Sequence, residues 1–441
     1  MGIISFSFFM IRAYTLIRVT ALYCNDAAHP LNLFENCFML FPLKVQYYKG
    51  LAKVLKVAAA IVPMPKPTLF TGTDSSLELC QAISQLGIQK VLIVTDEMLV
   101  SIGLLDKIKA SLKENKVKFV IYDGILPDPT YDQVESGLAI LKSNQCEAIL
   151  AVGGGSPIDA SKAIAARATN NKSLEKMAGL FKVFKTPLPL FAIPTTAGTG
   201  SEVTVVSVVS DPITHQKTPI IDPKLVPMMA ALDGSLMTGL PASITASTGM
   251  DALTHAIESY ISVNATSETD YYGLAATRLI MENLEVAVHD GSNIEARQNM
   301  SMASYYAGLA FTKASVGYVH AIAHNFGAKY STPHGLANSI VLPHILDYSK
   351  DEIVDRLAQL AKVSGLKKGS ESNKQLANKF ITRIRSMLRS FDIPEQLDSL
   401  QASDIPLIAK QALEEAHMNY PVPKYMNQKM CESILSKMVL N

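Results

Sequence analysis

The sequence lacks a clear excess of either charge. Its 441 residues include 40 basic and 39 acidic side chains, which gives a net charge of +1 at neutral pH. Proteins that bind nucleic acids present basic faces to the phosphates, and this sequence has neither such an excess nor a basic helix with interleaved aromatic residues. We therefore expect no nucleic-acid partner. The length allows two domains with separate cores.

Cysteines are few and scattered. They form neither a Cys-x-x-Cys pair nor a regular disulfide pattern, and they are odd in number: Cys24, Cys37, Cys80, Cys146 and Cys431. A dispersed set of this kind is typical of a protein in a reducing compartment. The sequence thus predicts a cytoplasmic protein without a disulfide framework.

The apolar segment at residues 3–11 is too short to span a bilayer, which needs about 20 apolar residues. Arg12 and Arg18 follow this segment, whereas a secretion signal carries its basic residues first. Residues 1–60 contain six basic and two acidic side chains, so a targeting segment or weak membrane contact is the alternative. We interpret residues 1–63 as an extension with no role in the chemistry, and we expect no stable membrane association.

Beyond this extension, short apolar segments alternate with helical patterns. Apolar residues recur at helical spacing over residues 101–115 and 131–144. The segments that read as strands cover residues 90–95, 118–122, 148–152 and 189–194. Strands that are apolar throughout indicate a parallel sheet covered by helices on both faces. We expect a Rossmann-like α/β dinucleotide-binding domain over residues 64–238.

After Leu240 the strand pattern stops, and Gly239 and Pro241 mark the change. Helical patterns follow over residues 243–262, 269–289, 294–313, 316–330 and 351–364, and again beyond Ser372. This predicts an all-α, metal-binding domain over residues 239–441. A cleft between the two domains is the expected place for the active site.

One segment, AILAVGGGSPIDASKAIAA, reads as a buried strand, three glycines and a helix. Ser156 suits the N-cap position, Pro157 the first helical position, and Asp159 completes a capping box. Gly154 and Gly155 let a diphosphate approach backbone N–H groups at the positive end of the helix dipole. The alternative is a glycine turn that only permits tight packing of strand against helix.

Two further segments favour a nicotinamide cofactor. Asp96 ends the strand segment VLIVTD, where its carboxylate would accept hydrogen bonds from an adenosine ribose and repel a 2′-phosphate. This favours NAD over NADP, although a helix cap is the alternative role for such an aspartate. The segment PTTAGTGSE follows another strand, and its small and hydroxyl-bearing residues would let a cofactor lie close to the backbone.

Histidines gather in the helical half. Asp251 and His255 are four residues apart and share one helix face, as do His320 and His324, and His334 follows after a turn. Buried imidazoles without partners are costly, so a shared metal ion is the simplest explanation. One carboxylate and three imidazoles fit Fe(II) and Zn(II); the absence of a thiolate favours iron. Such a metal acts as a Lewis acid on an alcohol or a carbonyl.

These motifs occur in the order found in a known family. From about Pro67 to the C-terminus the chain resembles the iron-containing (group III) alcohol dehydrogenases, on VLIVTD, GGGSPID, PTTAGTGSE, GMDALTHAIE and HAIAHNFGAKYSTPHGLAN. Within the family it looks most like the lactaldehyde reductases and 1,3-propanediol dehydrogenases. The resemblance implies reversible hydride transfer between NAD(H) and a small primary alcohol, diol or aldehyde, and at least a homodimer.

The resemblance also implies residue roles. Asp251, His255, His320 and His334 match the metal ligands, and His324 matches a histidine that faces nicotinamide and substrate without binding the metal. The implied cofactor residues are Asp96, Asp128, Gly154, Gly155, Ser156, Thr195, Thr196, Thr199, Val208 and Lys217. The family often has Asn where this chain has Asp128. We expect His324 to relay the proton, because an unperturbed imidazole pKa of about 6.5 suits that task.

Three other kinds of function are alternatives to this one. A glycerol-dehydrogenase-like polyol dehydrogenase or a maleylacetate-reductase-like enzyme shares the pattern. A dehydroquinate-synthase-type lyase would need several basic residues for an acidic substrate, and the helices that flank the ligands are rich in Ala, Leu and Tyr instead. A metal-stabilised structural or filament-forming module without turnover would not need the cofactor segments.

Overall fold

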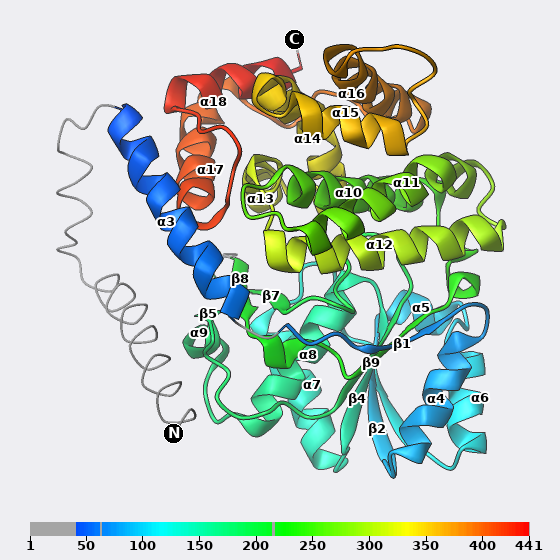
Figure 1. Cartoon of the computed structure of the whole chain (residues 1–441). Helices are drawn as coiled ribbons and strands as arrows, with labels where there is room; N and C mark the ends of the chain where they lie inside the picture. Colours follow the sequence, from blue (N-terminus) through cyan, green and yellow to red (C-terminus); the bar gives the residue numbers. More distant parts are fainter. Residues whose placement is uncertain (1–40, 62–63, 214–216, 441) are drawn as a thin grey trace, which may run out of the picture. The chain divides into compact units, whose positions relative to one another are not determined.

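The structure is a computed structural model that describes residues 41–61, 64–213 and 217–440 (Figure 1). By its internal contacts the chain separates into two compact units, Met1–Pro63 and Met64–Asn441. In the first unit the described element is helix α3 (Phe41–Ile61), and the expectation for residues 3–11 lies outside the described residues. None of the described helices is long and apolar enough to cross a membrane.

The second unit begins with a six-stranded parallel sheet. Its strand order is β1-β9-β6-β4-β2-β3, and every pairing in it is parallel. The strands are β1 (Thr68–Thr71), β2 (Lys90–Val94), β3 (Lys118–Tyr122), β4 (Ala148–Gly153), β6 (Leu190–Pro194) and β9 (Met229–Leu232). The sequence predicted β2, β3, β4 and β6 within one residue at each end; it predicted neither β1 nor β9, which lies inside the sheet.

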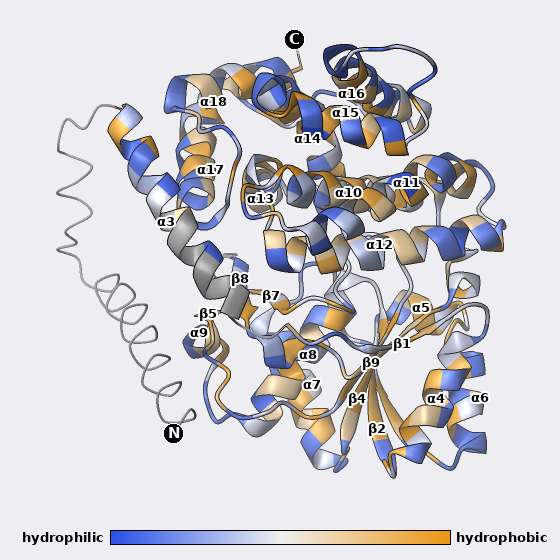
Figure 2. Ribbon diagram, viewed as in Figure 1, coloured by the Kyte–Doolittle hydropathy of each residue, from blue (hydrophilic) through white to orange (hydrophobic). Residues whose placement is uncertain are grey.

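Helices cover both faces of this sheet. Alternate residues of β2, β4 and β6 pack on one face against α7 (Tyr131–Ser143) and α8 (Gly155–Thr169). The intervening residues pack on the other face against α4 (Ser75–Gln85) and α6 (Asp106–Glu114). Figure 2 shows the resulting apolar centre of the sheet. Because each face is buried, the strands are apolar throughout, and the predicted parallel α/β fold is confirmed.

A smaller sheet joins β5 (Gly179–Leu180), β8 (Lys217–Ile221) and β7 (Val206–Ser210), in that order. The β7 and β8 strands are antiparallel. The sequence did not predict this sheet, because its strands are short and only Val209 and Ile220 among their apolar residues are buried. Strand β7 packs against α8.

The rest of the second unit is helical, as predicted. The long helices α10 (Ala242–Ile261), α11 (Ser267–His289) and α12 (Ile294–Ala314) pack against one another (Figure 1). They are followed by α13 (Tyr318–Tyr330), α14 (His334–Ser349), α15 (Val354–Val363), α16 (Asn373–Ser390), α17 (Ile405–Asn419) and α18 (Gln428–Leu435). The predicted domain boundary between residues 238 and 239 falls between β9 and α10. The division into two domains at this point stays a prediction.

One predicted helix, at residues 101–115, differs in the structure. The segment contains the end of the short helix α5 (Glu97–Ser101), a turn, and then α6 from Asp106. Gly103 lies in the turn with a φ of 72°, a left-handed conformation that breaks the helical path. The short helix α5 therefore stays next to the carboxyl end of β2.

Candidate metal and cofactor site

The carboxyl ends of three neighbouring strands carry the predicted cofactor residues. Strands β6, β4 and β2 lie side by side in that order. The threonine-containing loop follows β6, the glycine turn follows β4, and Asp96 follows β2. Because parallel strands end at the same edge of a sheet, the three segments meet at one edge, where such sheets bind their ligands.

The glycine turn and the threonine loop lie against each other. A Cβ atom on Gly154 would be 3.2 Å from Thr196 Oγ1, and one on Gly155 would be 2.8 Å from Thr199 Cγ2. The N–H of Thr195 donates to the carbonyl of Gly153 (3.0 Å) and joins the two segments. A side chain at either position would crowd the threonine loop, so glycine favours this approach. It brings two backbones together at the N-terminus of α8, where the helix dipole favours a diphosphate.

The predicted cap of α8 is wrong. The helix begins at Gly155 with Gly154 as its N-cap, so Ser156 lies inside the first turn. Asp159 does not close a capping box. It accepts hydrogen bonds from Ser201 Oγ (2.8 Å) and from the N–H of Val208 (2.9 Å), and it thereby ties α8 to the threonine loop and to β7. The N–H of Val208 is engaged by this bond.

A buried lysine, which the sequence reasoning missed, fixes the same loop. Lys162 of α8 is 0% exposed, and its Nζ donates to the carbonyl oxygens of Thr204 (2.9 Å) and Val206 (2.7 Å). Burial lowers the pKa of Lys162 to about 8. The only sequence signal was its place in the apolar stretch ASKAIAA.

Asp96 takes the alternative role that the sequence left open. Its Oδ1 accepts a hydrogen bond from the N–H of Leu99 (3.0 Å) and caps α5. The structure thus shows a capping role at the position expected for a ribose-binding carboxylate, and the cofactor role stays a prediction.

Asp128 and Lys217 form an ion pair. Lys217 Nζ lies 2.8 Å from Asp128 Oδ1, and the side chains are 24% and 64% exposed. Lys217 also approaches the helical half, because a Cβ on Gly327 of α13 would lie 3.9 Å from its Nζ. The lysine therefore stands between the cofactor segments and the helix that carries His320 and His324.

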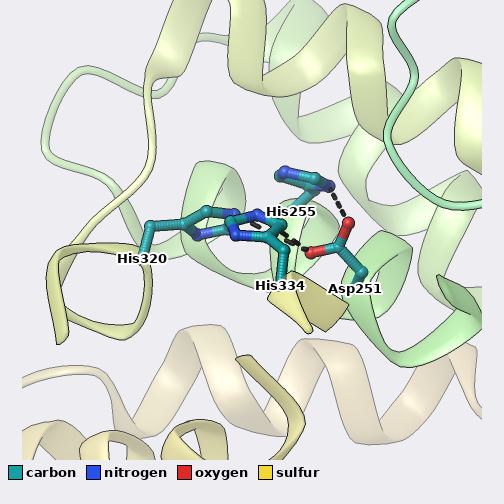
Figure 3. Close-up of side chains that lie close together, drawn as sticks. All are labelled: Asp251, His255, His320 and His334. Carbon is teal, nitrogen blue, oxygen red and sulfur yellow. Dashed lines mark ion pairs between the residues drawn. The ribbon is translucent and has the colours of Figure 1, made fainter. Parts of the chain in front are cut away.

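In the helical half, four side chains converge on one point (Figure 3). Asp251 and His255 come from α10, His320 from α13 and His334 from the start of α14. One ligand atom from each lies within 4.8 Å of the others. Asp251 Oδ1 is 3.7 Å from His334 Nε2 and 4.0 Å from His320 Nε2. The fold thus brings together the four residues that the family resemblance implied; the spacing alone had grouped His324 with them.

Two buried side chains that the sequence reasoning missed hold this cluster. Glu258 Oε2 lies 2.6 Å from His320 Nδ1, and the glutamate also accepts the N–H groups of Gly317 and Val319. This contact leaves His320 Nε2 to face the cluster, as a carboxylate behind a metal-bound histidine commonly does. Asn338 Nδ2 donates to Asp251 Oδ1 (2.7 Å) and lies 3.1 Å from His334 Nε2. Glu258 sits one turn beyond His255, and Asn338 one turn beyond His334.

The electrostatics of the cluster suit a cation. Burial lowers the pKa of His320 and of His334 well below the usual range, so both rings are neutral and offer lone pairs. Burial alone would raise the pKa of Asp251, but its polar surroundings, which include the hydrogen bond from Asn338, lower it, so the carboxylate stays ionised. His255 Nδ1 is buried and has no hydrogen-bond partner in the described part of the chain. The donor set therefore fits a divalent metal ion.

His324 lies beside the cluster rather than in it. Its ring stacks on that of His334 at a centroid distance of 5.4 Å, while its Nδ1 is 2.7 Å from Glu415 Oε1. Its side chain is 33% exposed, whereas that of His320 is 4% exposed. Phe311 of α12 stacks on His255 at 4.2 Å and closes another side of the cluster.

The chain matches two sequence profiles of one known protein family. Residues 66–234 match the iron-containing alcohol dehydrogenase profile, and residues 245–439 match the C-terminal profile of the Fe-containing alcohol dehydrogenase family. The chain belongs to the iron-containing alcohol dehydrogenase family. It is an NAD-dependent oxidoreductase of the alcohol dehydrogenase and aldehyde reductase type, as the sequence predicted.

Individual relatives agree with this placement. A 1,3-propanediol dehydrogenase of Klebsiella pneumoniae is 41% identical over 77% of this chain and 88% of its own length. An NAD-dependent methanol dehydrogenase of Bacillus methanolicus is 37% identical over 79% of this chain and 92% of its own. Among solved structures, a 1,3-propanediol oxidoreductase has a TM-score of 0.83 at 37% identity and covers 86% of this chain and 100% of its own.

Proposed function

We propose that the chain interconverts a small primary alcohol or diol with its aldehyde, using NAD and one iron ion. The observation that carries this is the cluster of Asp251, His255, His320 and His334, the first three of them buried, in the same unit as the glycine turn. These four side chains would hold the metal; Fe(II) is favoured, and Zn(II) also fits. A divalent metal there supplies Lewis acidity toward the alcohol or carbonyl oxygen.

The cofactor is proposed to lie along the carboxyl edge of the sheet. The turn at Gly154, Gly155 and Ser156 would receive the diphosphate, supported by the close approach of Thr196 and Thr199. Lys217, Asp128 and Val208 would meet the nicotinamide side, and Asp96 the adenosine ribose, with Thr195 in the loop. The carboxylate of Asp96 favours NAD over NADP, because it would repel a 2′-phosphate.

His324 is the proposed proton carrier. A bound nicotinamide would accept the hydride of the alcohol, and the partly exposed imidazole of His324 would give the released proton a path to solvent. A dehydroquinate-synthase-type reaction is disfavoured because Lys217, which approaches the helix that carries His320 and His324, is already paired with Asp128. The names of the diol and methanol dehydrogenases among the relatives support a small alcohol substrate.

Two broader properties complete the proposal. Cys80, Cys146 and Cys431 are free and buried, which supports a reducing cytoplasm. The family resemblance supports a homodimer or larger homo-oligomer. Fractionation of the source cell and light scattering of the purified protein test these two points separately.

The decisive experiment is anaerobic purification with metal analysis, followed by NADH oxidation with a panel of aldehydes and NAD reduction with methanol, 1,3-propanediol and glycerol. We expect iron near one ion per chain and activity on small aldehydes. Activity that persists in fully metal-free protein would contradict the proposal, and a marked preference for glycerol would favour the polyol dehydrogenase.

A further inference from the structure

A second hydrogen-bonded group stands behind His324. Glu415 Oε1, which lies 2.7 Å from His324 Nδ1, also accepts the O–H of Tyr420 at 2.6 Å. Glu415 lies near the end of α17, and Tyr420 follows the last residue of that helix. Helix α17 contributes none of the four side chains of the metal cluster. The three side chains form a chain from Tyr420 through Glu415 to His324.

The hydrogen bonds among these three side chains determine which ring nitrogen of His324 carries the hydrogen. An ionised carboxylate only accepts, so the imidazole nitrogen that faces it must be the donor. In the neutral ring, His324 Nδ1 then carries the hydrogen and Nε2 keeps the lone pair. Burial raises the pKa of Tyr420 well above its usual range, and the neighbouring Glu415 raises it further, so the phenol remains a donor.

The two helices are joined at a second point, which limits rotation of the pair. Tyr318 Oη lies 2.9 Å from His417 Nε2, so residues 318 and 324 of α13 face residues 417 and 415 of α17. The side chains of His324 and Glu415 are 33% and 28% exposed, and that of His334, on which His324 stacks, is 32% exposed, whereas Asp251 and His320 are almost fully buried. The carboxylate of Glu415, which α17 carries and the hydroxyl of Tyr420 contacts, thus orients the partly exposed ring of His324.

We infer that Glu415 and Tyr420 are positioning residues that hold His324 with Nε2 free to take the proton of the alcohol. The inference rests on the proton-carrying role proposed above. The alcohol O–H bond breaks, its electron pair stays on oxygen, and the proton bonds to Nε2. The hydrogen on Nδ1 stays on the ring and remains hydrogen-bonded to Glu415. The negative charge of Glu415 balances the imidazolium until the proton passes to water. The same arrangement stabilises the charged ring in carboxylate–histidine pairs of other enzymes.

The first test compares Glu415→Gln with Glu414→Gln in the metal-loaded enzyme. Glu414 is the adjacent residue, its side chain is 53% exposed, and it lies 3.7 Å from Lys410. We expect Glu415→Gln to lower kcat by about 10- to 100-fold, with KM and metal content unchanged. Glu414→Gln should have the kcat of the parent enzyme. Glu415→Asp, which keeps the charge, should have a higher kcat than Glu415→Gln. Tyr420→Phe should lower kcat only a few-fold.

The second test is a double-mutant cycle with His324→Ala. If Glu415 acts through His324, Glu415→Gln should change kcat less than twofold once His324 is alanine. A tenfold further loss in that background would overturn the inference, because Glu415 would then act elsewhere. A parent-like kcat for His324→Ala alone would instead overturn the proton role proposed for His324. The two failures are therefore distinguishable, and circular dichroism checks that each variant is folded.

Discussion

The two halves of the second unit build their parts of the site in different ways. In the helical half, four side chains meet at one point, and all but His255 are held by Glu258 or Asn338. In the α/β half, the site consists of small residues and backbone, with Gly155 against Thr199. Two charged residues predicted to meet the cofactor there, Asp128 and Lys217, are partly exposed and bind each other. Substitutions should therefore act sharply in the first half and mildly in the second.

The largest effect is expected from Asp251→Asn. The change keeps the size of the side chain but removes the only carboxylate among the four clustered residues. Metal content should fall below about a tenth of an ion per chain, and turnover by more than about 1,000-fold. Elemental analysis and NADH oxidation measure the two quantities.

The matched control for this change is Asp270→Asn. Asp270 forms a two-bond ion pair with Arg356, at 2.8 and 2.9 Å, away from the cluster. This variant should keep its metal even where its melting temperature falls. Full metal content in Asp251→Asn would show that the assignment of this ligand is wrong.

A smaller effect is expected from Glu258→Gln. The carboxylate contacts His320 Nδ1 and leaves Nε2 toward the cluster, so its loss should lower metal affinity or activity by about 10- to 100-fold. Titration of the metal-free protein with Fe(II) under anaerobic conditions gives the affinity. Glu282→Gln, which breaks an exposed pair with Arg278, is the control. Equal metal affinities in the two variants would remove Glu258 from the site.

In the α/β half, Gly155→Ala should raise KM for NAD by about tenfold, or about 1.4 kcal/mol of binding free energy. The new methyl group would lie 2.8 Å from Thr199 Cγ2, so the turn must shift. Metal content should stay unchanged. Adding Thr199→Ser removes that methyl contact and should restore part of the affinity; Gly239→Ala, with no atom within 4 Å, should have no effect. Failure of the serine to restore affinity would argue against a steric cause.

The smallest effect is expected from Asp128→Asn. The ion pair with Lys217 is partly exposed, so the free energy of unfolding should change by less than about 1 kcal/mol. KM for NAD should change by two- to fivefold and lose part of its salt dependence. Denaturant titration and kinetics at two ionic strengths measure these changes. A loss as large as that of Gly155→Ala would mean that the α/β half also depends on a fixed charge.

The same contrast explains what the sequence predicted. The spacing of Asp251 and His255 determines one helix face, so the cluster was found without coordinates. Strands β2, β4 and β6 were found because both of their faces are buried. Glu258 and Asn338 were missed, since one helical turn from a ligand is an ordinary position for a polar residue. The cap of α8 was mispredicted because Asp159 binds Ser201 and Val208, which lie far from it in sequence.

The pairing of β1 with β9 has a consequence for synthesis. Thr68 pairs with Met229, about 160 positions later, and β1 is the edge strand next to β9 in the described sheet. Closing a loop of that length costs about 4 to 5 kcal/mol of chain entropy. At 5–20 residues per second, β1 would leave the ribosome roughly ten to thirty seconds before its neighbour. During that interval its hydrogen-bonding edge is a target for other chains, so nascent protein should depend on chaperones more than the finished fold does.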